Sequence, residues 1–541
     1  MRPVILTVLL AALPPISQPG SQPDMPGRGA PATYANPVLP GDYPDPSVIR
    51  AGREYWATAT TSQWAPVFPL LRSTDLVTWQ HAGSVFDAPP AWSAGSYWAP
   101  EIVADRGRVF VYYTARRKGG PLCVAVADAP APGGPYTDRG PLVCQDAGSI
   151  DGAAVTDEKG QRYLVWKEDG NSRKQPTPLW AQPLTADGRR LTGEAREIFR
   201  NEAPWEAHLV EGQYLLRRGE WFYMFYSADA CCGRRCSYKL GVARARALLG
   251  PWERHPGNPI LAGNDDWRCP GHGTIVDTPG GRTYLLYHAY HPTDFQYVGR
   301  QGLLDEVMWG ADGWPAINAG RGPSATAPLP PGAMPQTPAA PRVADDFTGS
   351  RLDPRWQWPW DQGPAPRLDA GHLRLRAGSH STAVAARQTA SGAYLATASL
   401  DAASVTPGAR AGLAAFGNRD NLIAITLEAG PAQTAGTPPT VSVWQVRQGT
   451  RTVLANERVA AAGAIHFRLE AARGTHFRFA VSADGRQWTP LTTGAEGGDL
   501  PPWDLGVRVA LMVEGAGAAA AFDGFTLAPV PPASMAASQP N

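Results

Sequence analysis

The sequence predicts an all-β protein of two domains, a five-bladed β-propeller followed by an antiparallel β-sandwich. Short aromatic and aliphatic runs recur five times in roughly the first 320 residues, about 50 to 60 residues apart, which indicates a repeat architecture. No helical periodicity of useful length occurs anywhere in the chain. A stretch dominated by Pro, Ala and Ser then separates this repeat from a second, differently patterned region.

The recurring runs are rich in Tyr, Phe, Trp and Val, so each is expected to form a strand. They lie at 54–60, 108–115, 161–167, 220–228 and 282–289. A second element, in which a polar turn leads to an aromatic residue and a short strand, recurs in step at 72–86, 126–143 and 242–261. These features predict the inner strands and outer hairpins of five blades over residues 32–321. Six or seven blades would need more chain than is available.

Residues 322–342 are expected to form a stiff linker because of their Pro and Ala content. Segments from 343 to 530, such as HLRLRAG and HFRLEAA, alternate apolar and polar residues between Gly and Asp turns. That pattern is typical of an antiparallel β-sandwich. Residues 531–541 are expected to be a tail.

The N-terminus carries one Arg and then an apolar stretch of about ten residues before Pro and Gly, which is typical of a secretory signal peptide. We therefore assign 1–31 to a signal peptide and spacer, and expect a secreted or periplasmic protein. Six cysteines agree with export. Cys123 and Cys144 flank a hairpin-sized segment and are candidates for one disulfide, and a vicinal Cys231–Cys232 pair for another. Zinc is the less favoured alternative, because no second Cys/His pair follows at zinc spacing.

The composition favours a neutral partner. The formal net charge is +1 with no basic tract, which offers nothing to nucleic acid or to an anionic membrane. The 19 Trp residues suit sugar-binding surfaces as well as a core. The oligomeric state is not readable from these features.

Three acidic residues share a position relative to the recurring runs. Asp45, Asp151 and Glu211 each lie roughly 10 to 12 residues before a run. In a propeller, equivalent positions lie at equivalent depths around one axis, so the three carboxylates are expected to meet in a central pocket. An acid in an ordinary turn or at a strand start is the alternative for each residue taken alone.

Several motifs resemble glycoside hydrolase family 43 in order and spacing. They are NPVLPGDYPDPSVIR, SYWAPEI, SIDGAAVTDEKGQRYLVW, VEGQYLLRRGEWFYMFYS, GHGTIV and GRQGLLDEVMWGADGWP, which together cover about 35 to 320. The C-terminal region from DDFTGSRLDPRWQW to AFDGFTL resembles the concanavalin A-like, jelly-roll sandwich of β-xylosidases in that family. The resemblance implies a five-bladed propeller that hydrolyses arabinose- or xylose-containing glycans with inversion.

The resemblance also implies a role for each acid: Asp45 as general base, Glu211 as general acid, and Asp151 as the group that raises the pKa of Glu211 and orients it. Inversion requires two carboxylates on opposite faces of the sugar, roughly 6.5 to 9.5 Å apart. The acid must stay protonated near neutral pH, and a second anion beside it favours that state.

Other site residues follow from the same resemblance. Arg300 is expected to reach sugar hydroxyls, with a surface charge as the alternative. His272 is expected to face a bound cation, often calcium, through waters in the central channel, with a backbone-bonded core histidine as the alternative. Calcium prefers oxygen ligands, so its identity stays open. No cofactor is expected to be required for the reaction.

The remaining substrate-binding candidates are aromatic. Trp98 and Trp64 are candidates for walls of the subsite that holds the cleaved sugar, with plain blade core as the alternative, and Tyr43 is a candidate for the pocket lining. The sequence departs from the commonest family pattern at Gln213, where many members have Pro, and at 166–172. These departures leave the sugar preference open.

The favoured function is exo hydrolysis of terminal α-L-arabinofuranosyl or β-D-xylosyl residues from arabinan, arabinoxylan or xylo-oligosaccharides. An endo-1,5-α-L-arabinanase is the nearest alternative, and it would need an open groove across the propeller face. A non-catalytic carbohydrate-binding propeller is the alternative of another class, which retention of all three acids disfavours.

Overall fold

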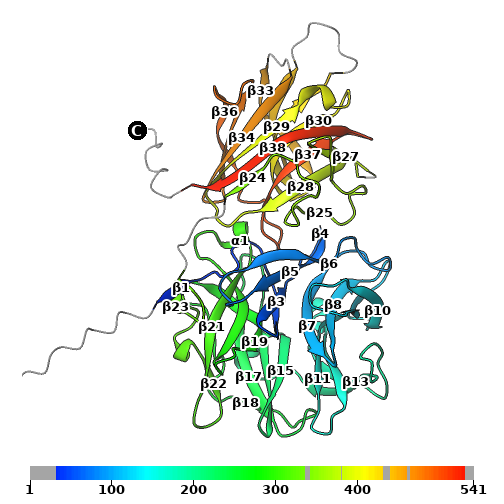
Figure 1. The fold of residues 1–541 in the computed structure, drawn as a ribbon, viewed down its shortest axis with the longest axis vertical. Coiled ribbons are helices and arrows are strands. Elements are labelled where there is room, and N and C mark those ends of the chain that lie inside the picture. Colours follow the sequence, from blue (N-terminus) through cyan, green and yellow to red (C-terminus); the bar gives the residue numbers. More distant parts are fainter. Residues whose placement is uncertain (1–31, 336–341, 379, 431–438, 460–462, 531–541) are drawn as a thin grey trace, which may run out of the picture.

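The structure is a computed structural model that describes residues 32–335, 342–378, 380–430, 439–459 and 463–530. It contains two β-rich parts, a propeller below and a sandwich above in Figure 1. The signal peptide and spacer expected at 1–31 and the tail expected at 531–541 lie outside the described residues. Within the described ranges, no helix has the length and apolar character needed to cross a bilayer.

The propeller consists of five antiparallel, four-stranded sheets, one for each predicted unit. The first two sheets contain β2 (Ser47–Ala51), β3 (Glu54–Thr58), β5 (Val67–Ser73) and β6 (Gln80–Phe86), and β7 (Trp98–Asp105), β8 (Arg108–Arg116), β9 (Leu122–Ala129) and β10 (Thr137–Val143). The third contains β11 (Ser149–Thr156), β12 (Arg162–Glu168), β13 (Leu179–Pro183) and β14 (Arg196–Phe199). The last two contain β15 (Val210–Arg218), β16 (Trp221–Ala228), β17 (Lys239–Ala245) and β18 (Glu253–Arg254), and β19 (Arg268–Asp277), β20 (Thr283–Tyr290), β21 (Gln301–Trp309) and β22 (Pro315–Ile317).

Each aromatic run of the sequence forms the second strand of its sheet, and the recurring polar-turn elements form the outer strands, as predicted. These second strands are almost entirely buried, because both of their faces pack against neighbouring sheets. The first strands β2, β7, β11, β15 and β19 each contact the next, and β19 contacts β2. The innermost strands therefore form a closed ring around one axis.

A short two-stranded sheet joins the two ends of the propeller. In it β1 (Thr33–Ala35) pairs with β23 (Thr326–Pro328), which lies within the stretch expected to be linker. The Pro and Ala content led us to expect a linker here, but Pro328 can lie in an edge strand, where it does not have to donate a hydrogen bond to the ladder. The chain between the two parts is therefore shorter than the sequence predicts.

The sandwich has one sheet of eight strands and one of six. The larger follows the order β26 (Arg367–Asp369), β27 (His372–Arg376), β38 (Ala519–Pro529), β29 (Tyr394–Asp401), β34 (Ala464–Ala472), β35 (His476–Ser482) and β36 (Thr489–Glu496), with β24 (Val343–Asp345) also on β38. The smaller follows β28 (Thr382–Gln388), β37 (Arg508–Glu514), β30 (Arg410–Asn418), β31 (Asn421–Glu428), β32 (Thr440–Arg447) and β33 (Thr450–Arg458). Helices are single turns: α1 (Phe295–Val298) and the 3-10 turns η1 (Gly170–Arg173), η2 (Pro204–Glu206), η3 (Asn318–Gly320) and η4 (Ala402–Ser404).

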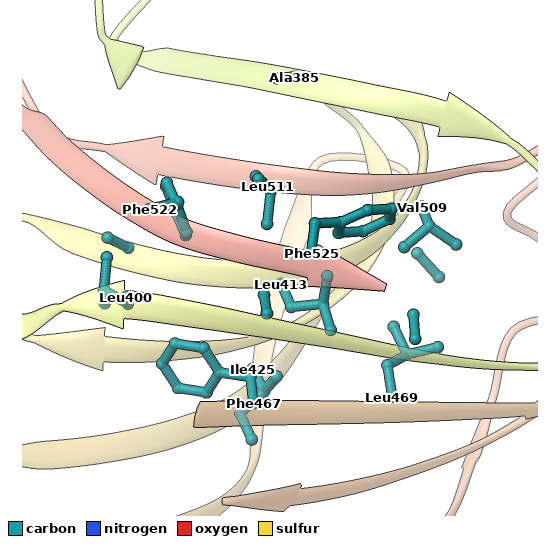
Figure 2. Close-up of a cluster of buried hydrophobic side chains, with 14 of the residues drawn as sticks. Ala385, Leu400, Leu413, Ile425, Phe467, Leu469, Val509, Leu511, Phe522 and Phe525 are labelled. Atoms are coloured by element: carbon teal, nitrogen blue, oxygen red, sulfur yellow. The ribbon is translucent and has the colours of Figure 1, made fainter. Parts of the chain in front are cut away.

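The core of the sandwich lies between its two sheets. Burial alternates along β29 and β34 with the period of two that the sequence predicted. Figure 2 shows the inward side chains meeting, among them Phe467 and Leu511, which are fully buried. Each such side chain contributes roughly 1.5 to 3 kcal/mol through its removal from water.

The two parts share buried structure rather than a flexible joint. Tyr297 and Val298 of the propeller turn α1 belong to the core of the sandwich. The propeller strand β4 (Trp64–Ala65) pairs with β25 (Trp358–Pro359), which follows the linker. Figure 1 shows α1, β4 and β25 at this boundary. The sandwich is thus docked through both backbone pairing and apolar burial.

All six cysteines form disulfides. Cys123 pairs with Cys144 and Cys231 with Cys232, as the sequence suggested, and Cys236 pairs with Cys269. The zinc alternative is therefore wrong, because every thiol is used.

Candidate active site

Each blade places one residue with a left-handed backbone near the start of its innermost strand. These residues are Asp45, Ala99, Asp151, Gly212 and His272, with φ values of 51°, 44°, 56°, 59° and 44°. In β7, β11, β15 and β19 the pairing register shifts beside that residue, which marks a β-bulge. A bulge bends the strand and re-aims its side chains. The left-handed backbone thus recurs in all five blades, and at Asp45, Asp151 and His272 it belongs to residues with polar side chains.

The Asp45 carboxylate contacts Thr60, Arg300 and His272, and its backbone contacts His288. The Thr60 hydroxyl donates to Asp45 Oδ2 at 2.7 Å, and Arg300 Nη1 donates to Oδ1 at 3.0 Å. His272 Nδ1 lies 3.4 Å from the same Oδ1, and the Asp45 backbone N–H donates to His288 Nδ1 at 3.0 Å. Burial alone would raise the pKa of Asp45, but Arg300 and His272 outweigh burial and hold the pKa far below its usual range. Asp45 is therefore ionised and fixed in orientation.

Glu211 is held by two hydrogen-bond donors, one on each oxygen. Lys167 Nζ lies 2.6 Å from Oε2, and the Tyr238 hydroxyl donates to Oε1 at 3.0 Å. The Lys167 side chain is 1% exposed and also contacts Asp169 at 3.1 Å. Burial would raise the pKa of Glu211, but the Lys167 ammonium outweighs it and lowers the pKa below the ordinary value.

Asp151 lies beside Glu211. The Gly212 backbone N–H donates to Asp151 Oδ2 at 2.9 Å, and Gln213 Nε2 donates to the Asp151 carbonyl. Burial raises the pKa of Asp151 to about 6, with Glu211 adding to the rise although His272 and Lys167 oppose it. The sequence led us to expect a raised pKa at Glu211. That expectation is wrong in direction, because Lys167 stabilises the Glu211 anion and the proton is favoured on Asp151.

Arg300 connects the site to the sandwich. Its Nη1 bonds Asp45, and its Nη2 donates to the backbone carbonyl of Asp504, a sandwich residue, at 3.2 Å. Arg300 is 4% exposed, so the surface-charge alternative is wrong. The Asp504 carboxylate accepts a hydrogen bond from Ser62, whose oxygen in turn accepts from Trp98 Nε1 at 2.6 Å. A loop of the second domain thus completes the wall beside Asp45.

His272 contacts Asp45 and has its backbone N–H bonded to the Ser227 hydroxyl at 2.8 Å. Among the described residues, no group of three or more His, Cys, Asp or Glu side chains is arranged to hold a metal ion. Calcium takes about six to eight oxygen ligands. The side chains around His272 do not supply that set directly, so a water-mediated calcium stays a prediction and no step of the reaction is derived from it.

Trp98 and Trp64 line one groove between the domains, and Tyr43 lies in another cavity. Trp98 is half-buried near Asp504, and its ring meets Trp503 edge-on at 6.4 Å between centroids. Trp64 is 2% exposed and lies in the interface between the domains. Its ring contacts Phe416 edge-on, and the Arg508 guanidinium lies 4.4 Å from the ring centre. Trp64 is therefore packed in the core of the interface rather than free to stack on a sugar. The Tyr43 hydroxyl bonds His81 Nε2 at 2.8 Å in a separate cavity between the domains.

The sequence did not predict several neighbours of the acids, namely Thr60, His288, Lys167 and Tyr238, nor Asp504 beside Arg300. Lys167 could have been predicted in part, because a lysine in the largely apolar run 161–167 is expected to be buried and therefore to pair with a buried acid. Asp504 gave no such signal, because it lies more than two hundred residues away in another domain. Gln213, which departs from the commonest family pattern, bonds the Asp151 carbonyl and so ties β15 to β11.

The fold and site together define a five-bladed propeller with buried carboxylates on its axis and a sandwich closing one side. Residues 34–315 match the profile described as glycosyl hydrolases family 43, and residues 344–527 match the β-xylosidase C-terminal concanavalin A-like domain. The chain therefore belongs to glycosyl hydrolase family 43.

Known relatives agree with this assignment. The chain is 31% identical over 320 residues to "Xylosidase/arabinosidase 43B" of Humicola insolens, covering 54% of this chain and 57% of that protein. It is 25% identical over 311 residues to the "Extracellular exo-alpha-(1->5)-L-arabinofuranosidase ArbA" of Cellvibrio japonicus, covering 51% and 86%. The crystal structure of the GH43 protein BlXynB from Bacillus licheniformis superimposes with a TM-score of 0.77 at 25% identity, covering 92% of this chain and all of that one. The chain spans less than two thirds of the length of the first of these relatives.

Proposed function

We propose that this protein is an inverting glycoside hydrolase that removes terminal α-L-arabinofuranosyl or β-D-xylosyl residues from plant-polysaccharide fragments. The observation that carries the proposal is the contrast between Asp45 and the Asp151–Glu211 pair. Asp45 is locked as an anion, whereas the pair holds a proton under mildly acidic conditions. Inversion requires one ionised carboxylate as base and one carboxyl group that carries a proton.

In this mechanism Asp45 accepts a proton from the water that attacks the anomeric carbon. Arg300 and Thr60 keep the carboxylate ionised and oriented while the water approaches. Glu211 gives a proton to the leaving glycosidic oxygen. Because each of these two buried carboxyl groups affects the ionisation of the other, they titrate as a pair, and Asp151 serves as the reservoir from which Glu211 is protonated. Tyr238 holds Glu211 toward the sugar through Oε1.

An exo mode is supported by the sandwich loop beside the site. A groove of about 470 Å³ between the domains is lined by Trp98, Trp360 and Trp503, with Asp504 at the end that contacts Arg300 and Ser62. The Trp503 side chain is 61% exposed, which leaves its ring available to stack on a sugar. We assign the groove to the leaving group of the substrate. The sandwich loop at this edge disfavours an endo-arabinanase, because an endo-acting enzyme needs the polysaccharide to continue on both sides of the cleaved bond.

The test is hydrolysis of nitrophenyl α-L-arabinofuranoside and β-D-xyloside, followed by NMR of the anomer first released from arabinan and xylo-oligosaccharides. Release of single pentoses with inverted configuration is expected. Retention of configuration, or oligosaccharides as first products, would contradict the proposal.

Two isosteric variants separate catalysis from binding. Glu211→Gln and Asp45→Asn each keep the shape of the side chain but lose its acid–base chemistry, so turnover is expected to fall by about 100-fold or more while sugar binding persists. If the unmodified protein binds pentosides but never turns them over, the protein is a non-catalytic carbohydrate-binding propeller instead.

Export from the cell is also part of the proposal. Three disulfides among the described residues support an oxidising compartment. The Cellvibrio japonicus relative is described as extracellular. Detection of the protein in the culture medium or periplasm of its host, with an N-terminus processed near residue 31, would support this part, and an unprocessed cytoplasmic protein would contradict it.

A further inference from the structure

A second cavity lies between the domains, apart from the three acids and from the groove assigned to the leaving group. Its volume is about 220 Å³, and it is lined by the propeller segment 38–43 and strands β5 and β6 on one side and by β28 and β38 of the sandwich on the other. Ligand pockets for drug-sized molecules have roughly 300 to 1,000 Å³. The cavity is therefore suited to an occupant of about monosaccharide size or smaller.

Three buried polar atoms on its lining have no hydrogen-bond partner in the part of the chain that the structure describes. They are Nδ1 of His81, Nη1 of Arg387 and Oγ1 of Thr389. Arg387 and Thr389 are each 2% exposed. A buried polar group that loses its partner costs roughly 1 to 3 kcal/mol. Three such atoms on one cavity indicate that something polar occupies it.

The charges on this lining favour an anion. Arg355 donates to both oxygens of Asp353, and Arg387 Nη1 lies 3.1 Å from Asp353 Oδ1 without the geometry of a hydrogen bond. Two guanidinium groups thus share the Asp353 carboxylate. Arg355 interacts with the Asp345 carboxylate as well, so Arg387 is the less fully paired of the two arginines. Burial, together with the same two arginines, lowers the pKa of His81 to about 4, so its imidazole is neutral and adds no charge of its own.

We propose that this interdomain cavity binds a small carboxylate, with Arg387 and Thr389 as its donors. A carboxylate accepts from a guanidinium more strongly than a neutral hydroxyl does, and its second oxygen can accept from the Thr389 hydroxyl. The carboxylate could belong to a sugar acid or to a simple organic acid. Because the lining comes from both domains, the bound anion would stabilise their docking.

The cavity also borders the segment that carries the catalytic base. Tyr43, whose hydroxyl bonds His81, donates its backbone N–H to the Arg300 carbonyl at 2.7 Å. Occupancy is therefore expected to stabilise the segment that leads to Asp45, two residues further on.

The test is calorimetric titration of the full chain with sodium acetate, sodium glucuronate and inorganic phosphate at constant ionic strength, with sodium chloride and neutral glucose as controls. Acetate or glucuronate is expected to bind and to raise the Tm. A glucuronate affinity at least about tenfold above that of acetate would identify a sugar acid, and equal affinities a simple carboxylate. A cavity that holds only water would bind none of the anions, and phosphate binding alone would also overturn the proposal.

Thr389→Val is the discriminating variant. Its hydroxyl has no partner in the ligand-free protein, so the change should leave the Tm without ligand unchanged or higher, yet weaken carboxylate binding by about tenfold. The matched control is Thr58→Val, which removes another fully buried, unpartnered hydroxyl on β3, outside this cavity. Arg387→Met is expected to weaken binding further. Equal binding by the wild type and Thr389→Val would refute the site, and since the readout is binding rather than turnover, such a failure leaves the proposed hydrolase activity standing.

Discussion

At the scale of single residues, the position of Lys167 decides how Glu211 ionises. Its ammonium group is 2.6 Å from Glu211 Oε2 and is buried with it, so the attraction between the two charges is poorly screened by water. An acid that must deliver a proton is thus held next to a cation that favours its anion. In the proposed mechanism, the Asp151–Glu211 pair therefore holds the proton for the leaving group only below the raised pKa of Asp151, about 6.

Lys167→Met is therefore expected to move the basic limb of the kcat/KM profile toward alkaline pH. Glu211 must be protonated to act, so activity falls as pH rises through its pKa. Lys167 lowers that pKa, and its removal lets burial and Asp151 raise it. The measurement is kcat/KM against pH on a nitrophenyl pentoside.

The control for this variant is Lys159→Met, which removes an exposed lysine in a turn. Its profile is expected to match that of the wild type. A Lys167→Met profile with an unmoved basic limb but lower kcat would assign Lys167 to orientation of Glu211 alone.

The residues on the propeller axis were predictable only in part. Asp45, Asp151 and Glu211 could be found because a repeat converts equal sequence phase into equal depth, and His272 followed from the family resemblance. Lys167 lies in β12, the second strand of its blade. The position of a residue in that strand predicts that its side chain is buried, but not that it lies near the axis. The sign of the Glu211 pKa shift depended on that one contact, so no argument from the three acids alone could have given it.

At the scale of strands, Asp128 ties two blades together. It lies on β9 with its side chain fully buried, and it accepts from Arg108 of β8 at 2.8 Å and from Arg139 of β10 at 2.5 Å. Arg189, from the loop between β13 and β14 of the next blade, adds a third contact at 2.8 Å. Burial opposes ionisation, but the three arginines outweigh it and lower the pKa of Asp128.

Asp128→Asn is expected to destabilise the propeller by about 1 to 3 kcal/mol at pH 7, a range that allows for the partial exposure of the arginines. Because the folded-state pKa is depressed, the contribution is present above the unfolded pKa of about 3.9 and is lost as pH falls toward the folded value. Denaturant unfolding at pH 7 and pH 3 should show the gap between wild type and variant narrowing in acid. Asp87→Asn, at an exposed position, serves as the control, and a gap independent of pH would contradict this assignment.

The strands themselves were largely predictable, and the exceptions have physical causes. Buried second strands stand out because both faces are apolar, and sandwich strands stand out by alternation. β23 was hidden in a Pro-rich stretch because an edge position does not require a donor from Pro328. The bulges of the inner strands were also hidden, since a positive φ at Asp151 or His272 leaves no mark in composition.

At the scale of the whole molecule, the sandwich is a structural part of the candidate active site. Residues 504–508 of the sandwich make several hydrogen bonds to the propeller. Among them, the Asp504 carbonyl accepts from Arg300, the Gly506 N–H donates to Asp42 Oδ2 at 3.0 Å, and Arg508 Nη1 donates to the same oxygen at 3.4 Å. Asp42 Oδ1 in turn accepts from the Arg300 N–H at 3.2 Å. Asp45, the proposed base, is thus oriented by an arginine whose own position depends on the second domain.

The Asp42–Arg508 pair is the most direct test of that dependence, since the two side chains are only 2% and 1% exposed. Removing one partner leaves the other as an uncompensated buried charge, so Asp42→Asn and Arg508→Met are each expected to lower stability by about 3 to 5 kcal/mol. The double variant leaves neither charge, so its loss of stability should be smaller than the sum of the two single losses by about 1 to 3 kcal/mol.

Both single variants should also lower kcat/KM, because Asp42 bonds the Arg300 backbone. Arg410→Met, which removes a partly exposed arginine paired with Glu428 away from the interface, should leave kcat/KM unchanged. Additive losses of stability together with unchanged kcat/KM would show that the sandwich is docked on the propeller without orienting its catalytic base.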